Sequence, residues 1–138
     1  MARYRRTSAR PEDAIQKAVF QHIRLRGVRG LVAWHTPNGG KRNPIEGAIF
    51  KSLGVRAGVA DVLAFYDKQF FAMELKSEGQ RPTESQLEFL ADLEKQGAFT
   101  AIATGIDQAL KTLEIWGLLR GTTVNDVLRI NAERMEAR

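Results

Sequence analysis

The chain has 138 residues, of which 43% are hydrophobic and 27% are charged, and it contains no cysteine. These values predict one compact domain with its own core, and they exclude a disulfide scaffold and a thiolate zinc site. No apolar run is long enough to span a membrane, and no apolar stretch follows the basic first ten residues as a secretory signal requires.

The net charge is +5, and lysine and arginine gather in the first half of the chain. A basic surface with a basic arm favours a polyanionic partner, with nucleic acid as the first candidate. Many soluble proteins are also basic, so charge alone leaves both interpretations open. The arm holds Arg3, Arg5, Arg6 and Arg10.

A first helix is predicted from Pro11 to Leu25. Proline suits the first helical position, and Glu12 and Asp13 suit the positive end of the helix dipole. Glu12 shares a helical face with the apolar residues Ile15, Val19 and Ile23, so it is expected to point inward. An acid in such a position is unusual unless it has a specific role. A functional acid and an acid favoured by the dipole stay equal alternatives here.

Three short segments follow. Residues 31–36 are predicted as a strand, residues 37–44 as a loop rich in turn formers, and residues 45–54 as a helix closed by Gly54. The loop carries Asn38, Lys41 and Arg42, for which phosphate contact and plain solvation are both open.

Next, a hairpin is predicted from strands at residues 60–66 and 69–76. Asp67 and Lys68 are its two turn residues, although Asp-Lys is not a favoured pair for such a turn. A turn of another length would shift the pairing of the strands.

Two acids and a lysine interrupt the apolar rows of this hairpin. With a two-residue turn, Asp61 lies directly opposite Glu74, and Lys76 follows on the same face. Opposed carboxylates repel, so burial raises one pKa unless a cation lies between them. Mg²⁺ suits such a place because it prefers oxygen ligands and keeps several waters. The alternative is a solvated sheet edge with a salt bridge, which these three residues alone favour.

The following helix is predicted at residues 83–97, with Gly97 as its end and with Leu87, Leu90 and Leu93 facing inward. Residues 98–104 form an apolar strand, as expected for the buried centre of a sheet.

A further helix spans residues 106–119, and the charged tail after it is left open as helical or loose. The order of elements describes an α/β sandwich around a small mixed sheet.

Read together, "GVRAGVADVL" and "FFAMELKSEGQRPTESQLEFLADLEKQGAF" closely resemble the VRR-NUC (virus-type replication-repair nuclease) family of the PD-(D/E)XK superfamily. The resemblance spans about residues 12–110. It rests on a glycine-flanked Asp at a strand start, an E-x-K at the next strand end, a glycine-containing loop and a helix that opens with Gln. Ala60 departs from the pattern, because the family usually has proline before the Asp.

The resemblance implies a restriction-endonuclease-like α/β core with a small mixed sheet flanked by helices, over residues 11–120. Residues 1–10 are then expected to be a flexible basic arm and residues 121–138 a charged tail.

The resemblance also implies a site. Asp61, Glu74 and the main-chain carbonyl of Leu75 would bind Mg²⁺ or Mn²⁺, with Glu12 as the acid from the first helix. Lys76 would position or activate the attacking water.

Gln86 matches the glutamine of the family motif, and it also stands three residues after Thr83, as in a capping box. His35 is interpreted as a structural hydrogen bonder. The residues expected to contact nucleic acid are Arg5, Arg6, Asn38, Lys41, Arg42, Arg56 and Arg81.

A metal-dependent endonuclease acting on DNA follows from the resemblance, selective for branched, junction or duplex structure rather than for sequence. The family implies phage or bacterial replication, recombination or repair, a homodimer, no membrane partner, and a cytoplasmic location in a bacterial or phage-infected cell. The alternatives are a catalytically silent nucleic-acid-binding module of the same fold, a nuclease acting on RNA, and a restriction-type enzyme.

Overall fold

A computed structural model of the chain describes residues 10–37, 43–122 and 124–136. The strands of its sheet are β1 (Val32–Trp34), β2 (Val62–Tyr66), β3 (Gln69–Lys76) and β4 (Phe99–Thr104). The helices are α1 (Pro11–Arg26), α2 (Pro44–Ser52), α3 (Glu84–Lys95), α4 (Gly105–Ile115) and α5 (Val124–Glu136).

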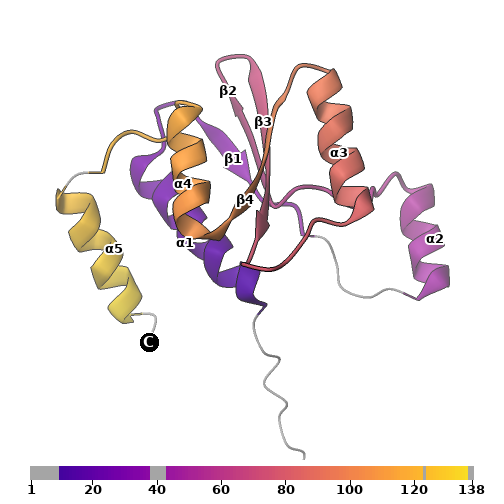
Figure 1. Ribbon diagram of the computed structural model, residues 1–138, viewed down its shortest axis with the longest axis horizontal. Coiled ribbons are helices and arrows are strands. Elements are labelled where there is room, and N and C mark those ends of the chain that lie inside the picture. The colour runs from indigo at the N-terminus through magenta and orange to yellow at the C-terminus, as the bar shows by residue number, and fades with distance from the viewer. Residues whose placement is uncertain (1–9, 38–42, 123, 137–138) are drawn as a thin grey trace, which may run out of the picture.

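The strands lie in the order β1-β2-β3-β4, and helices cover both faces of the sheet (Figure 1). α1 and α4 pack on one face, with α5 outside them, and α3 packs on the other. β1, β2 and β3 are antiparallel, whereas β4 runs parallel to β3, so the predicted mixed sheet between helices is confirmed. None of the helices described here is long and apolar enough to cross a membrane.

The hairpin has the predicted register. Val62 lies opposite Met73, and the two strands meet at a two-residue turn of Asp67 and Lys68. Both turn residues have positive φ, 48° and 62°, as a type I′ turn demands. If this pairing is extended by one residue beyond Val62, Asp61 lies opposite Glu74.

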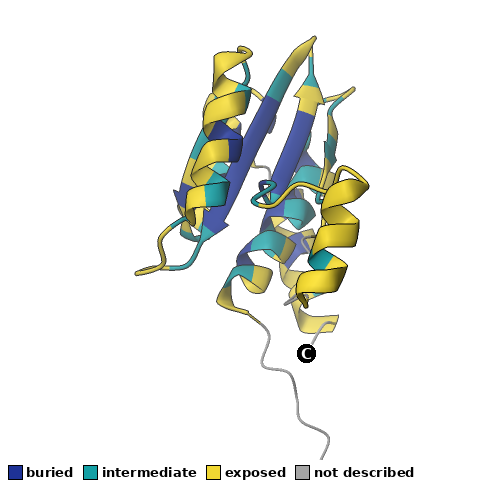
Figure 2. Ribbon diagram, turned by 90° about the vertical axis from the view of Figure 1, so that its right-hand side faces the viewer, coloured by how far each residue is buried: buried dark blue, intermediate teal, exposed yellow. Residues whose placement is uncertain are grey.

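The core lies on both sides of β2 and β3, and most residues of these two strands are buried (Figure 2). Toward α1 and α4, the side chains of Met73 and Leu75 are inaccessible to solvent and pack with Val19 and Leu113. Toward α3, a smaller cluster holds Ala60, Leu63, Ala72, Phe89 and Leu90. The middle of β3 is therefore fixed from both faces, and the site residues at its end inherit that rigidity.

The apolar strand after α3 is not the centre of the sheet, which corrects the prediction. Among the described strands β4 pairs with β3 alone and forms an edge, and Phe99 and Ile102 are 43% and 39% exposed. The prediction was wrong because an apolar run identifies a strand but does not say how many neighbours it has.

A second correction concerns α3. Leu87 is 47% exposed, while Phe89 takes a buried position beside Leu90, with Leu93 partly buried. The face that meets the sheet therefore passes through Gln86, Phe89, Leu90 and Leu93 at helical spacing. This face carries Gln86 toward the open end of the sheet.

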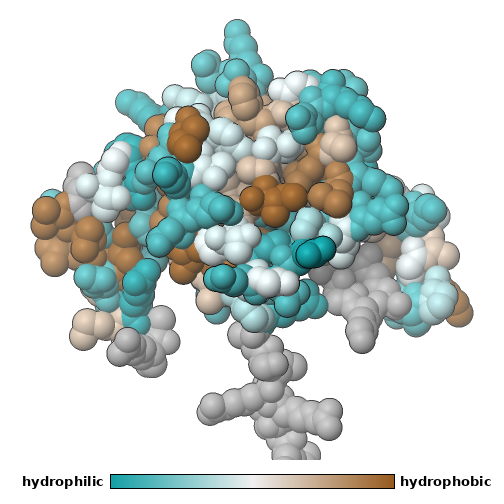
Figure 3. All heavy atoms as spheres, viewed as in Figure 1, coloured by the Kyte–Doolittle hydropathy of each residue, from teal (hydrophilic) through white to brown (hydrophobic). Residues whose placement is uncertain are grey.

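The charged tail holds a helix, α5, which packs along α1 (Figure 1). Asp126 and Ile130 are buried on its inner side. Its exposed residues are mixed in polarity. Figure 3 shows a group of apolar side chains at this end of the molecule, and the exposed apolar residues of α5 are Val124, Val127, Leu128 and Met135.

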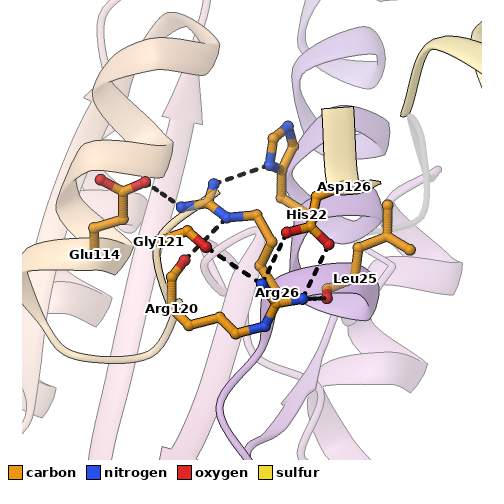
Figure 4. Close-up of polar contacts among 7 residues, drawn as sticks. All are labelled: His22, Leu25, Arg26, Glu114, Arg120, Gly121 and Asp126. Carbon is orange, nitrogen blue, oxygen red and sulfur yellow. Dashed lines mark hydrogen bonds and ion pairs between the residues drawn. The ribbon is translucent and has the colours of Figure 1, made fainter. Parts of the chain in front are cut away.

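A partly buried polar network joins α1, α4, α5 and the segment between α4 and α5 (Figure 4). The guanidinium of Arg26, 1% exposed, donates to the main-chain carbonyl of Arg120 at 3.0 Å, to Nδ1 of His22 at 3.0 Å and to the carboxylate of Glu114. Arg120 in turn donates to both oxygens of Asp126, at 2.8 and 3.0 Å. We call these five residues the Arg26 cluster.

Each charge in the Arg26 cluster meets an opposite charge or a carbonyl. Because Arg26 donates to Nδ1 of His22, that nitrogen carries a lone pair and the imidazole is neutral. Burial and the charge of Arg26 lower the pKa of His22, which keeps it in this state.

Candidate active site

A polar pocket of about 480 Å³ opens where β3 ends and where α1 and α3 begin. The end of β1, the start of β2 and the end of β3 meet at this edge because the three strands are antiparallel. Every predicted catalytic or metal-binding residue lies on its wall, which consists of Arg10, Glu12, Asp13, Gln16, His35, Pro37, Asp61, Glu74, Leu75, Lys76 and Gln86.

Asp61 lies in the bend directly before β2 and is held at two points. One of its carboxylate oxygens, Oδ2, accepts the main-chain N–H of Leu75 at 2.8 Å. Its main-chain carbonyl accepts a hydrogen bond from Nδ1 of His35 at 2.7 Å. The carboxylate is thus fixed against the end of β3, beside Glu74.

Glu74 is only 2% exposed, although it is an acid, and it lies near the end of β3. Its Oε1 lies 3.4 Å from Nζ of Lys76, while its Oε2 has no hydrogen-bond partner among the described residues. A buried carboxylate oxygen without a partner is costly, and native proteins contain few of them.

The surroundings of Glu74 oppose its ionisation. Burial is the largest cause, and the charge of Asp61 and a hydrogen bond shared with Asp61 add to it, whereas Lys76 acts in the other direction. Together they raise the pKa of Glu74 from 4.5 to about 8. With its pKa raised to about 8, Glu74 favours the protonated form at neutral pH, so the acid pair, Asp61 and Glu74, takes up a proton when no cation is bound.

The acid pair fits a divalent metal ion. A buried carboxylate oxygen with no partner among the described residues and a second carboxylate beside it offer oxygen donors, which suit Mg²⁺ or Mn²⁺ better than Zn²⁺. Among the described residues, no three His, Asp or Glu side chains gather closely enough to hold an ion alone. Water would complete the coordination, as is usual for Mg²⁺.

Glu12 and Gln16 contribute the α1 wall of the pocket. Glu12 accepts a hydrogen bond from the hydroxyl of Ser77 at 3.2 Å, so it faces the pocket but does not join the acid pair as a third member of a cluster. Its predicted role as a ligand stays a prediction.

Gln86 has the capping role that its spacing indicates. Its side-chain oxygen accepts the N–H of Thr83 at 2.9 Å, and its own N–H donates to the hydroxyl of Thr83 at 3.3 Å. The residue also lines the pocket, so the cap and a place in the site are compatible.

The start of α3 is pressed against the chain that leads into β2. A Cβ atom at Gly58 would come within 2.3 Å of the main-chain carbonyl of Ser85, and φ of Gly58 is +80°. Only glycine allows this approach, which brings Gln86 to the same pocket as Asp61.

The predicted nucleic-acid contacts are placed only in part. Arg56 is paired with Asp92 at 2.6 Å and lies over the ring of Phe89, away from the pocket wall. Arg81 is exposed just before α3 and is also absent from the pocket wall. The other five, Arg5, Arg6, Asn38, Lys41 and Arg42, lie outside the described residues.

Five residues of the pocket wall were not part of the predicted site: Arg10, Asp13, Gln16, His35 and Pro37. Two of them bear on its chemistry, and one of these, His35, has the hydrogen-bonding role that the sequence suggested. Arg10 lies at the N-terminus of α1 and adds a cation to the wall, and His35 contacts the main chain of Asp61. The position of His35, directly after a predicted strand, was the available signal, but nothing local in the sequence marks its partner 26 residues away.

Comparison with known proteins gives matches in structure only. No family model matches the chain, and no curated protein matches it. A solved structure described as "VRR_NUC domain protein" superposes with a TM-score of 0.64 at 25% identity, covering 77% of this chain and 87% of that one. A second, described as "VRR_NUC domain", has a TM-score of 0.53 at 19% identity, covering 77% of this chain and 97% of the other.

Proposed function

From the assignment of this chain to the VRR-NUC family, which these matches support, we propose that it is a metal-dependent endonuclease that hydrolyses DNA phosphodiester bonds. VRR-NUC domains are nuclease domains, and the chain has their fold. The observation that carries the proposal is the buried Oε2 of Glu74 beside Asp61, for which the described part of the chain supplies no hydrogen-bond partner. Burying this oxygen without a partner destabilises the fold, and such an arrangement is expected where the acid pair binds a cation during catalysis.

The residues of the pocket divide the work of hydrolysis. Asp61, Glu74 and the carbonyl of Leu75 would hold Mg²⁺ or Mn²⁺, with Glu12 behind them on α1. When bound, the ion lowers the pKa of a water and polarises a phosphoryl oxygen. Fixed carboxylates on the end of a rigid strand keep the reacting groups in place without reorganisation.

Lys76 is a cation in contact with the acid pair, with Nζ 3.4 Å from Oε1 of Glu74, and its side chain is 12% exposed. It would hold the attacking water and stabilise the negative charge that develops as water adds to phosphorus and the ester P–O bond breaks. Gln86, fixed by its cap to Thr83, would orient the same water.

Substrate binding would rest on the phosphate backbone. Arg10 on the pocket wall, together with the predicted contacts of the arm and of the loop at residues 37–44, would neutralise phosphates without reading bases. We therefore propose selectivity for DNA structure, such as a branch or junction, in phage or bacterial replication, recombination or repair, in the cytoplasm.

We further propose that the enzyme acts as a homodimer, because one pocket engages one strand and a junction or duplex break needs two cuts. Sedimentation equilibrium of the purified chain tests this directly. A mass of one chain at micromolar concentration, with full junction cleavage, would exclude the dimer.

The deciding experiment incubates the purified chain with labelled four-way junction, flap, single-stranded and duplex DNA, and with RNA, in Mg²⁺, Mn²⁺ or EDTA. Glu74→Gln is the test variant and Glu88→Gln, an exposed acid on α3, is the matched control. Metal-dependent cutting of DNA by the wild type and the control, lost in Glu74→Gln, is the expected result.

The other possible results of the cleavage experiment would contradict or change the proposal. Cutting in EDTA, or by Glu74→Gln at the wild-type rate, would remove the metal site. Cutting of RNA alone would change the substrate class, and binding without cutting in every metal would indicate a silent binding module.

A further inference from the structure

The site contains a hydrogen bond whose function the proposed roles leave open. β1 pairs with β2 only as far as Trp34 opposite Leu63, and beyond that point the two segments no longer pair as strands. The pocket lies in the opening that results, with His35 and Pro37 on one side and Asp61 on the other.

Side chains replace the strand pairing at this opening. On the β1 side, Nδ1 of His35 bonds the main-chain carbonyl of Asp61 at 2.7 Å. On the β3 side, the carboxylate of Asp61 accepts the main-chain N–H of Leu75 at 2.8 Å. Asp61 is therefore braced across three segments, although it lies in a bend and not in a strand.

The partner defines the state of the histidine. A carbonyl oxygen only accepts, so Nδ1 of His35 must carry the hydrogen. This bond orients the peptide group that follows Asp61 and hence the direction of its Cα–Cβ bond. Partners of this kind, one step behind a ligand, commonly set metal affinity.

We infer that His35 is a positioning residue for Asp61, which holds the carboxylate in the geometry that binds the divalent ion. The inference rests on the proposed function, since it concerns the same acid pair. It assigns to His35 an effect on metal affinity and not merely on folding.

The test compares three variants with the wild type by calorimetric titration with Mn²⁺. His35→Asn keeps an N–H close to the position of Nδ1, whereas His35→Gln and His35→Ala lose it. We expect Kd for Mn²⁺ to rise about 10- to 100-fold in His35→Ala and His35→Gln, and to change only a few-fold in His35→Asn. DNA cleavage by His35→Ala should recover toward the wild-type rate when Mn²⁺ is raised to saturation.

His22, the other histidine of the chain, is the matched control. Because it belongs to the Arg26 cluster, His22→Ala should lower the melting temperature and leave Kd for Mn²⁺ unchanged. If His35→Ala does not fold, the contrast between His35→Asn and His35→Gln decides the question.

Two results would overturn the inference. Wild-type Mn²⁺ affinity in folded His35→Ala or His35→Gln would leave the proposed metal site intact and reject only the role of His35. A wild type that binds no Mn²⁺ and cuts no DNA would reject the metal site, and with it this inference.

Discussion

The domain buries charge in two places, and the two places are built differently. In the Arg26 cluster, every buried charge has a partner: Arg26 meets Glu114 and a carbonyl, and Arg120 grips both oxygens of Asp126. In the acid pair, two carboxylates face one lysine and one buried oxygen has no partner among the described residues.

The difference separates groups that hold the fold from groups that await a ligand. A satisfied buried network fixes the relative position of α1, α4 and α5, although its net contribution to stability is modest. An unsatisfied pair destabilises the fold and persists only where something else requires it. Four changes should break or sharpen this contrast.

The largest effect is expected on catalysis in Glu74→Gln. Removing the charge that holds the ion should lower the cleavage rate by about 10³-fold, which corresponds to roughly 4 kcal/mol of activation free energy. The fold should survive, because glutamine has nearly the same size and shape as the glutamic acid that it replaces. Single-turnover cleavage of a junction, with circular dichroism as the check on folding, measures both; a rate within tenfold of wild type would contradict the role of Glu74.

Arg26→Met should have the opposite effect, because it should lower the stability of the fold and leave catalysis intact. Deleting one partner of a buried ionic network costs about 3 kcal/mol of unfolding free energy, near the low end of the known range because Glu114 stays within reach of water. Cleavage per folded molecule should be unchanged. Urea unfolding tests this against Arg24→Met, whose exposed pair with Glu133 should contribute less than about 1 kcal/mol.

The third prediction concerns pH. Because the pKa of Glu74 is raised to about 8 in the metal-free fold, its contribution to stability is fully present below its unfolded value of 4.5 and is lost as pH rises through 8. As pH rises from 4.5 to 8, the unfolding free energy of the wild type in EDTA should fall by about 1.4 kcal/mol per pH unit relative to that of Glu74→Gln.

Urea midpoints of both proteins at pH 5, 6, 7 and 9 measure this difference. The lowered pKa of His22 acts in the reverse direction, destabilising the fold as pH falls, but it is common to both proteins and cancels in the comparison. Parallel curves for the two proteins would mean that the acid pair is not protonated as described.

The smallest effect is stabilisation by the ion. At about five times its Kd, Mn²⁺ should add about 1 kcal/mol of unfolding free energy to the wild type and nothing to Glu74→Gln. At a fixed Mn²⁺ concentration the gain should be greater at pH 8.5 than at pH 6, because binding requires the deprotonated acid pair. Thermal unfolding with and without the ion, beside Arg24→Met as a control, measures it.

The acid pair could be predicted from the sequence because its geometry depends on residues that are close together in the chain. Asp67 and Lys68 set the turn, the turn sets the register, and the register alone brings Asp61 to Glu74. The helix after the hairpin begins at a capping box that is also local in sequence, so Gln86 could be placed in the site as well.

What the sequence did not reveal depends on distant contacts. Arg26 meets Glu114 across 88 residues, and His35 meets Asp61 across 26, with no periodicity that links either pair. The edge position of β4 and the outward turn of Leu87 are likewise properties of neighbours, which an apolar pattern does not record.

The two-residue turn between β2 and β3 also has a genetic consequence. Because neighbouring residues of a strand point to opposite faces, deleting one codon at Asp67 or Lys68 would slip the strands by one residue and separate Asp61 from Glu74. Such an in-frame deletion lies at the far end of the hairpin from the pocket. In a mutational screen for nuclease activity, the deletion should nonetheless be as damaging as substitution of both acids. Most substitutions at the same two codons should leave the activity unchanged.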